Sequence, residues 1–175
     1  RLRIQYGTSF FSPMSAIGAH VSAVPNHQTG RGISLHTSGI VAMTGAFGYE
    51  LSLGKLSEEE KEQVKEQIRL YKEYETLIGN GDYYRLSNPF KDAYAAWMFV
   101  SKDRRTVLLH VVMLENHGNM TVSYVKLKDL LPDASYEEKE SKRCYQGSAL
   151  MQAGIPLPVE MKEYPAYQFL FTVKG

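Results

Sequence analysis

The hydrophobic pattern of the chain changes its period near residue 80, and this change constrains the fold more than any other feature. Residues 57–78 carry apolar side chains at intervals of three and four, the spacing of an amphipathic helix. From residue 82 onward, apolar and aromatic residues recur at every second position, as strands require. We therefore expect two parts, residues 1–81 and residues 82–175, joined by the short Gly-Asn-Gly sequence at residues 79–81.

The helix predicted at residues 57–78 has recognisable ends. Ser57 is a suitable N-cap, and Glu60 three residues later completes a capping box. The glutamates at 58–60 lie at the positive end of the helix dipole, and the glycines at 79 and 81 stop the helix. One apolar stripe predicts the buried face: Val64, Ile68, Tyr71 and Ile78, with Tyr74 and Leu77 beside them.

The part before this helix alternates short apolar runs with helical or loop segments. Residues 16–21 and 47–51 are strand candidates, residues 35–44 form a short helix, and a polar loop covers residues 25–32. This order indicates βα units. The opening residues 1–6 resemble the end of a helix, which Gly7 would close in the left-handed conformation. We therefore expect the natural protein to continue upstream.

The second part is predicted to be an antiparallel β-sandwich. Residues 94–101 and 106–114 are rich in β-branched and aromatic residues, with a hairpin turn between them. Further strands are expected at 119–127 and 165–174. The charged segment 135–142 is interpreted as an edge strand or a loop. A helical turn at 148–153, ended by Gly154, completes the pattern.

Charge and composition exclude several classes of partner. The formal net charge is +1, from 20 basic and 19 acidic residues, which gives no electrostatic case for binding nucleic acid or an anionic membrane. No apolar run approaches the ~20 residues of a membrane span. The single cysteine, Cys144, cannot form an internal disulfide, which favours the reducing cytoplasm.

Several blocks of sequence are too long and too irregular to arise from strand propensity. They lie at residues 6–11, 14–31, 47–51, 95–101, 145–151 and 154–158, and include the run from His20 to Arg31. These blocks closely resemble the bacterial α-galactosidases of glycoside hydrolase family 36, and the resemblance extends over almost the whole chain.

The resemblance implies a specific architecture. Residues 1–81 would be the C-terminal part of a catalytic (β/α)8 TIM barrel, with strand seven at 16–21 and strand eight at 47–51. Residues 82–175 would be the C-terminal β-sandwich domain. Members of the family are retaining enzymes with two catalytic aspartates, both upstream of the region that this chain matches. We therefore expect no catalytic residue here, and no activity from the isolated chain.

The end of the first strand and the loop after it carry the candidate substrate-binding residues. In a (β/α)8 barrel, loops at the carboxyl ends of the strands build the active-site face. The candidates are His20, Ser22, Asn26, His27 and Gln28. The alternative is that these side chains satisfy the backbone of their own loop. The two histidines lack a matching acidic or cysteine pattern, so we expect neither a metal nor another cofactor.

Three further residues have side chains capable of a chemical role. Glu50, on the second strand, could point into the barrel or toward the helices, and an orienting or structural role is favoured over catalysis. His110 and Trp97 lie in apolar strands, so we predict that both belong to the core.

The function predicted by the resemblance is hydrolysis of melibiose- or raffinose-type α-galactosides by a longer parent enzyme, which would be a homo-oligomer. One alternative is a carbohydrate-binding or assembly module, with Tyr83, Tyr84, Tyr164 or Tyr167 as sugar platforms. Another is a fragment of an α-galactosyltransferase similar to raffinose synthase.

Overall fold

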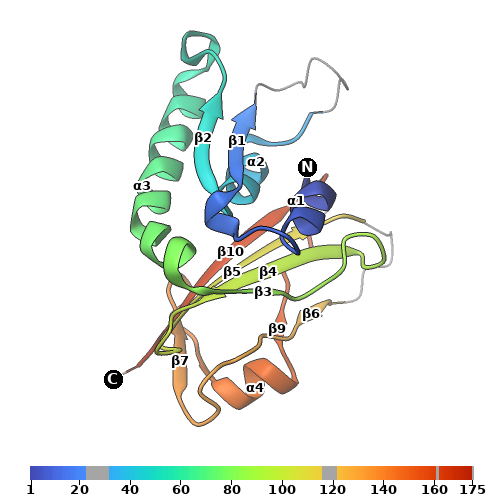
Figure 1. The fold of residues 1–175 in the computed structure, drawn as a ribbon, viewed down its shortest axis with the longest axis vertical. Helices are drawn as coiled ribbons and strands as arrows, with labels where there is room; N and C mark the ends of the chain where they lie inside the picture. The colour runs from blue at the N-terminus through green and yellow to red at the C-terminus, as the bar shows by residue number, and fades with distance from the viewer. Residues whose placement is uncertain (23–31, 116–121, 161, 175) are drawn as a thin grey trace. The chain divides into compact units, whose positions relative to one another are not determined.

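The computed structural model describes residues 1–22, 32–115, 122–160 and 162–174, and the chain divides into two compact units, residues 1–79 and residues 80–175 (Figure 1). The first unit contains α1 (Leu2–Thr8), η1 (Met14–Ala16), β1 (Gly18–Ser22), α2 (Leu35–Ala42), β2 (Ala46–Glu50), η2 (Leu53–Lys55) and most of α3 (Glu58–Asn80).

The first unit is built around a parallel strand pair. β1 and β2 run side by side with Gly18 opposite Ala46 and Ser22 opposite Glu50 (Figure 1). The chain between them contains α2, so the expected strand–helix–strand unit is confirmed. The short helix expected at residues 35–44 is present as α2.

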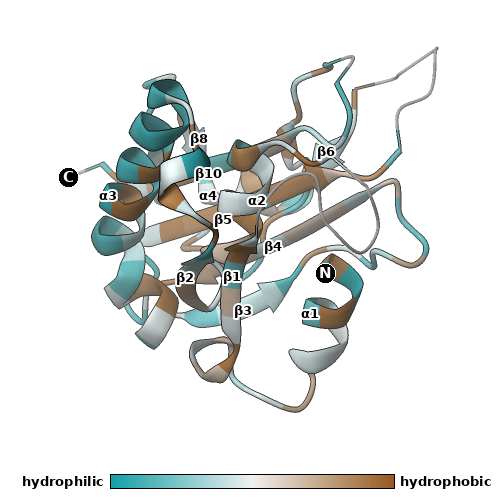
Figure 2. Ribbon diagram, turned by 90° about the horizontal axis from the view of Figure 1, so that it is seen from above, coloured by the Kyte–Doolittle hydropathy of each residue, from teal (hydrophilic) through white to brown (hydrophobic). Residues whose placement is uncertain are grey.

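Helix α3 is hydrogen-bonded to the β1–α2–β2 unit through Gln67, which the apolar stripe did not include, and through the hydroxyl of Tyr71, which it did. Gln67 is buried, accepts a hydrogen bond from the Tyr49 hydroxyl at 2.7 Å, and donates to the Leu35 carbonyl at 2.9 Å. The Tyr71 hydroxyl donates to the Gly45 carbonyl at 3.1 Å. A buried amide is tolerated here because its polar atoms have partners. In Figure 2, the hydrophilic residues of α3 lie along one side of the helix.

The capping box predicted for this helix is present. The Glu60 amide donates to the Ser57 hydroxyl at 3.2 Å, and the Ser57 amide donates to the Glu60 carboxylate at 2.8 Å. Two backbone donors that the first turn would leave without partners are thus satisfied reciprocally.

Replacing Ser57 by alanine should lower the free energy of unfolding of the first unit by about 1 kcal/mol, because one of these donors loses its acceptor. Urea unfolding followed by circular dichroism at 222 nm measures the change. Ser52→Ala is the matched control, since Ser52 precedes η2 without a capping side-chain hydrogen bond. An equal loss in both variants would contradict the prediction.

The second unit is antiparallel throughout its described sheets. Its elements are β3 (Asp82–Arg85), β4 (Tyr94–Val100), β5 (Thr106–Met113), β6 (Tyr124–Val125), β7 (Ser135–Glu138), β8 (Cys144–Gln146), α4 (Gly147–Gln152), β9 (Ile155–Pro156) and β10 (Ala166–Val173). Six strands form one sheet in the order β3-β4-β5-β10-β7-β8, and β6 pairs with β9. The last strand of the chain is therefore inserted between β5 and β7.

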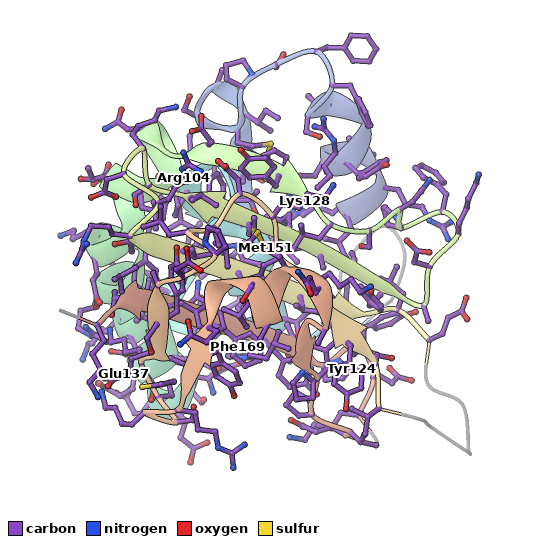
Figure 3. The ribbon with its side chains drawn as sticks, turned by 90° about the horizontal axis from the view of Figure 1, so that it is seen from below. Arg104, Tyr124, Lys128, Glu137, Met151 and Phe169 are labelled. Carbon is purple, nitrogen blue, oxygen red and sulfur yellow. The ribbon has the colours of Figure 1, made fainter. Side chains whose placement is uncertain are left out.

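One face of the six-stranded sheet holds the main core of the unit. Met98, Leu109 and Phe171 from neighbouring strands are fully buried there with Val125 of β6 and Leu150 of α4. These covering elements lie on one side of the sheet (Figure 1). Figure 3 labels Met151 on α4 and Phe169 on β10, two of the partly buried side chains packed against this core. The antiparallel β-structure expected for this part is confirmed.

Local sequence signals placed one turn and the end of α4 correctly. The segment 102–105 does connect β4 to β5 as a tight turn, with Arg104 at φ 58°. Gly154 ends α4 at φ +87°, and a Cβ at this position would also lie 2.6 Å from the Val125 carbonyl oxygen. Glycine is required there for both reasons.

Three expectations were wrong in detail. Gly7 does not close α1, because the helix continues to Thr8 and ends at Ser9 in the right-handed region. The strand β7 is not an edge, since β8 pairs on its outer side. The strand expected at 119–127 is reduced to β6 within the described residues, and residues 119–121 lie outside them.

Across the described ranges, no helix combines the length and the apolar character needed to span a membrane.

Candidate functional site

The two faces of the β1–β2 pair differ sharply. Ala19 and Val21 of β1 are buried with Ala42 of α2, and Phe47 and Tyr49 of β2 pack against the same cluster. Because successive side chains on a strand point to opposite faces, the intervening residues lie on the other face. That face, which we call the bare face, carries Gly18, His20 and Ser22 from β1 and Gly48 and Glu50 from β2.

This alternation decides the orientation of Glu50. The carboxylate lies on the same face as the His20 imidazole, opposite the face that packs against α2. The distance from His20 Nδ1 to Glu50 Oε1 is 3.5 Å, and their side chains are 45% and 67% exposed. The two groups therefore form a solvent-accessible imidazole–carboxylate pair, which we call the His20–Glu50 pair.

Arg1 connects the end of β1 to the start of the chain. Its guanidinium donates to the His20 carbonyl, and a second guanidinium nitrogen donates to the Ser22 hydroxyl at 2.8 Å. Ser22 and Glu50 are opposite each other at the last position of their strands. Arginine, serine, histidine and glutamate side chains thus come together at the carboxyl ends of two parallel strands.

Two of the five predicted substrate-binding residues, His20 and Ser22, lie within the described structure, where they share the bare face. Asn26, His27 and Gln28 lie outside the described residues. A role in substrate binding therefore stays a prediction for all five. The sequence analysis did not identify Arg1 and Gly48 as members of this group. Residues 48 and 50 lie two apart on one strand and therefore share a face, but only the strand register shows that this face is the one that carries His20.

His110, a histidine of the second unit, has a different character. His110 is fully buried, and burial lowers the pKa of its imidazole to about 3, so the ring is neutral at physiological pH. Its Nε2 lies 2.7 Å from Gln168 Nε2, and its ring lies 5.4 Å from the ring of Trp97, which is also buried. Both residues belong to the core, as predicted. The low pKa makes His110 unsuited to proton transfer near neutral pH.

Metal-ligating side chains do not gather in the described part of the chain: it holds no group of three or more histidine, cysteine, aspartate or glutamate residues arranged to bind an ion. Cys144 is a free, exposed thiol.

Each of the two units matches a known protein-family model. The model described as "Melibiase" matches residues 1–81, and the model described as "Glycosyl hydrolase family 36 C-terminal domain" matches residues 94–171. The chain belongs to glycoside hydrolase family 36.

Relatives within family 36 match almost every residue of the chain. The bifunctional α-galactosidase/sucrose kinase AgaSK of Mediterraneibacter gnavus is 60% identical over 172 residues, which is 98% of this chain and 18% of that protein. The α-galactosidase AgaA of Geobacillus stearothermophilus is 49% identical over 164 residues, which is 94% of this chain and 22% of that protein. The chain therefore spans about a fifth of the length of these curated relatives.

Solved structures of family 36 proteins have the same fold in the corresponding region. The galactosidase domain of AgaSK superposes with a TM-score of 0.97 at 60% identity, over 99% of this chain and 24% of that chain. AgaA of Geobacillus stearothermophilus in complex with raffinose gives a TM-score of 0.96 at 44% identity, with the same coverage.

Proposed function

We propose that this chain is the C-terminal part of an α-galactosidase, which removes terminal α-galactosyl residues from melibiose- or raffinose-type sugars with retention of configuration. The observation that carries the proposal is the 60% identity to AgaSK over 98% of the chain. Substituted forms of a second relative, AgaA, have been crystallised with raffinose and with stachyose.

The architecture proposed for residues 1–81 is the last portion of a (β/α)8 barrel. A parallel pair of strands with helices packed on one face is the repeating unit of such a barrel. Two strands cannot close a barrel, so we expect apolar surface that further strands and helices would cover. Among the described residues of the first unit, the large exposed apolar side chains are Ile4, Phe10, Phe11, Ile33, Leu53 and Ile68.

The catalytic carboxylates are proposed to lie upstream of the chain. A retaining glycosidase needs two carboxyl groups about 5 Å apart across the scissile bond. Glu50 is the only acidic residue among residues 1–57, and all other acidic residues of the first unit are on α3. A single strand-borne carboxylate cannot supply both the nucleophile and the acid, so the chain contributes binding surface and structural support.

We place the protein in the bacterial cytoplasm as a homo-oligomer.

The alternative of a free-standing carbohydrate-binding module has less support. Tyr84 donates its hydroxyl to Asp129 at 2.8 Å, the Tyr83 ring packs 5.3 Å from Phe99, and the Tyr167 ring stacks on Phe169. Of the four tyrosines considered as sugar platforms, only Tyr164 is exposed. One exposed ring is a small platform for a sugar.

The test compares two purified proteins: this chain, and the longer family 36 polypeptide that contains it. We expect the longer polypeptide to release p-nitrophenol from p-nitrophenyl α-galactoside and galactose from raffinose, with NMR showing α-galactose as the first product. The chain alone should release neither. Turnover by the chain alone, or none by the longer polypeptide, would contradict the proposal. Adding sucrose as a competing acceptor separates hydrolysis from galactosyl transfer.

A further inference from the structure

The imidazole of His20 packs against a glycine of the neighbouring strand. Gly48 is opposite His20 in the parallel register. A Cβ at Gly48 would lie 2.6 Å from His20 Cδ2 and 3.2 Å from Nε2, and the three nearest atoms to it all belong to the His20 ring. A Cβ at Gly18 would lie 3.6 Å from His20 Cε1. The ring therefore occupies space that exists only because residue 48 has no side chain.

The carboxylate of Glu50 distinguishes the two nitrogens of the His20 ring. With Glu50 Oε1 3.5 Å from Nδ1, the proton of a neutral imidazole is favoured on Nδ1. Nε2 is then a hydrogen-bond acceptor. The Ser22 hydroxyl, which accepts from Arg1, can donate its own proton outward. The bare face thus presents an acceptor nitrogen and a hydroxyl donor, a combination that suits the hydroxyl groups of a neutral sugar.

The place of these groups in the fold agrees with a binding role. Ser22 and Glu50 are the last residues of two parallel strands. Ligands of α/β proteins bind at the carboxyl ends of such strands.

We propose that the His20–Glu50 pair, seated on Gly48, binds hydroxyl groups of the α-galactoside. The proposal rests on the function proposed above and specifies one of its binding contacts. His20 makes the contact, Glu50 is a positioning residue that orients the imidazole, and Gly48 provides the space for the ring.

The experiment uses the longer family 36 polypeptide with raffinose as substrate. We expect His20→Ala and Gly48→Ala each to raise KM about tenfold and to change kcat less than about threefold, because a ground-state hydrogen bond is lost. In the double variant, Gly48→Ala should add nothing to His20→Ala, since the new methyl group no longer meets a ring. Glu50→Gln should raise KM in the wild-type background and have no effect in the His20→Ala background.

A matched control is available on α3. Glu62→Gln makes the same carboxylate-to-amide change at an exposed residue paired with Lys65, and KM should stay at the wild-type value. Circular dichroism and thermal unfolding verify that each variant is folded.

Titration with 1-deoxygalactonojirimycin, which binds without turnover, locates the contact. Weaker binding by His20→Ala assigns the contact to the galactosyl group, and unchanged binding with a raised raffinose KM assigns it to the remainder of the substrate. An unchanged KM in folded His20→Ala overturns the proposal, as does a Gly48→Ala effect of equal size in both backgrounds. A wild-type polypeptide without α-galactosidase activity overturns the proposed function itself.

Discussion

Replacing Phe171 by alanine should lower the free energy of unfolding of the second unit by about 3–5 kcal/mol, the range for removing a buried aromatic ring. Phe171 is 0% exposed on β10, the strand inserted between β5 and β7. Its ring packs against Tyr145 at 6.2 Å in an edge-to-face arrangement. The strands on both sides restrict collapse into the cavity, which places the loss toward the upper end of the range.

The measurement can be made specific to this unit. Trp97 is the only tryptophan in the chain and lies on β4, so its fluorescence during urea unfolding reports on the second unit. Phe169→Ala is the control, because Phe169 lies on the same strand and the same face but is only partly buried (Figure 3). It should cost less than half as much. Equal losses in the two variants would contradict the burial assigned to Phe171.

Acidification from pH 7.5 to pH 5 should lower the free energy of unfolding of the second unit by about 2 kcal/mol. Burial lowers the pKa of His110 in the folded state to about 3. In the unfolded chain the imidazole titrates near its ordinary pKa of about 6.5. Below that pH the unfolded state binds more protons than the folded state, so stability falls, by up to about 1.4 kcal/mol per pH unit.

A second titrating group acts at lower pH and does not enter this window. Burial alone would raise the pKa of Glu138, but hydrogen bonds from Ser141 and from the Glu140 and Ser141 amides, together with the charge of Lys142, bring the pKa below its usual value. A carboxylate of this kind contributes stability above its unfolded pKa, near 4.5, and that stability is lost only as the pH falls further.

The variants His110→Leu and His110→Phe isolate the histidine. Whatever their stability at pH 7.5, both should lose most of the dependence on pH between 7.5 and 5, because no imidazole remains to take up a proton at that position. Trp97 fluorescence during urea unfolding at each pH gives the slopes. A wild-type protein whose urea midpoint is constant over this range would show that His110 is not held neutral by burial.

Elements that depend on neighbouring residues could be predicted from the sequence. The capping box joins Ser57 to Glu60 over one helical turn, and both of its hydrogen bonds are present. The turn at 102–105 and the glycine that ends α4 are equally local. In each case the interacting groups are a few residues apart, so backbone geometry and hydrogen bonding within one turn determine the outcome.

The candidate site was only partly predictable for the same reason. His20 and Ser22 were recognised from a sequence block, but the orientation of Glu50 depends on the register between two strands separated by α2. A shift of one residue would have turned Glu50 toward the helix-covered face. The packing of the His20 ring against Gly48 follows from the same register. No local sequence pattern distinguishes Gly48 from any other glycine in a strand.

By itself, the sequence determined the family and the capped start of α3, because these depend on motifs and on short-range hydrogen bonds. Only the tertiary structure decided that Gln67 is buried, that β7 is covered by β8, and that the final strand lies between β5 and β7. These outcomes depend on contacts between residues far apart in the chain. The free energy that stabilises each of these arrangements comes from packing and strand pairing with residues far away in the sequence, so a short stretch of sequence does not predict it.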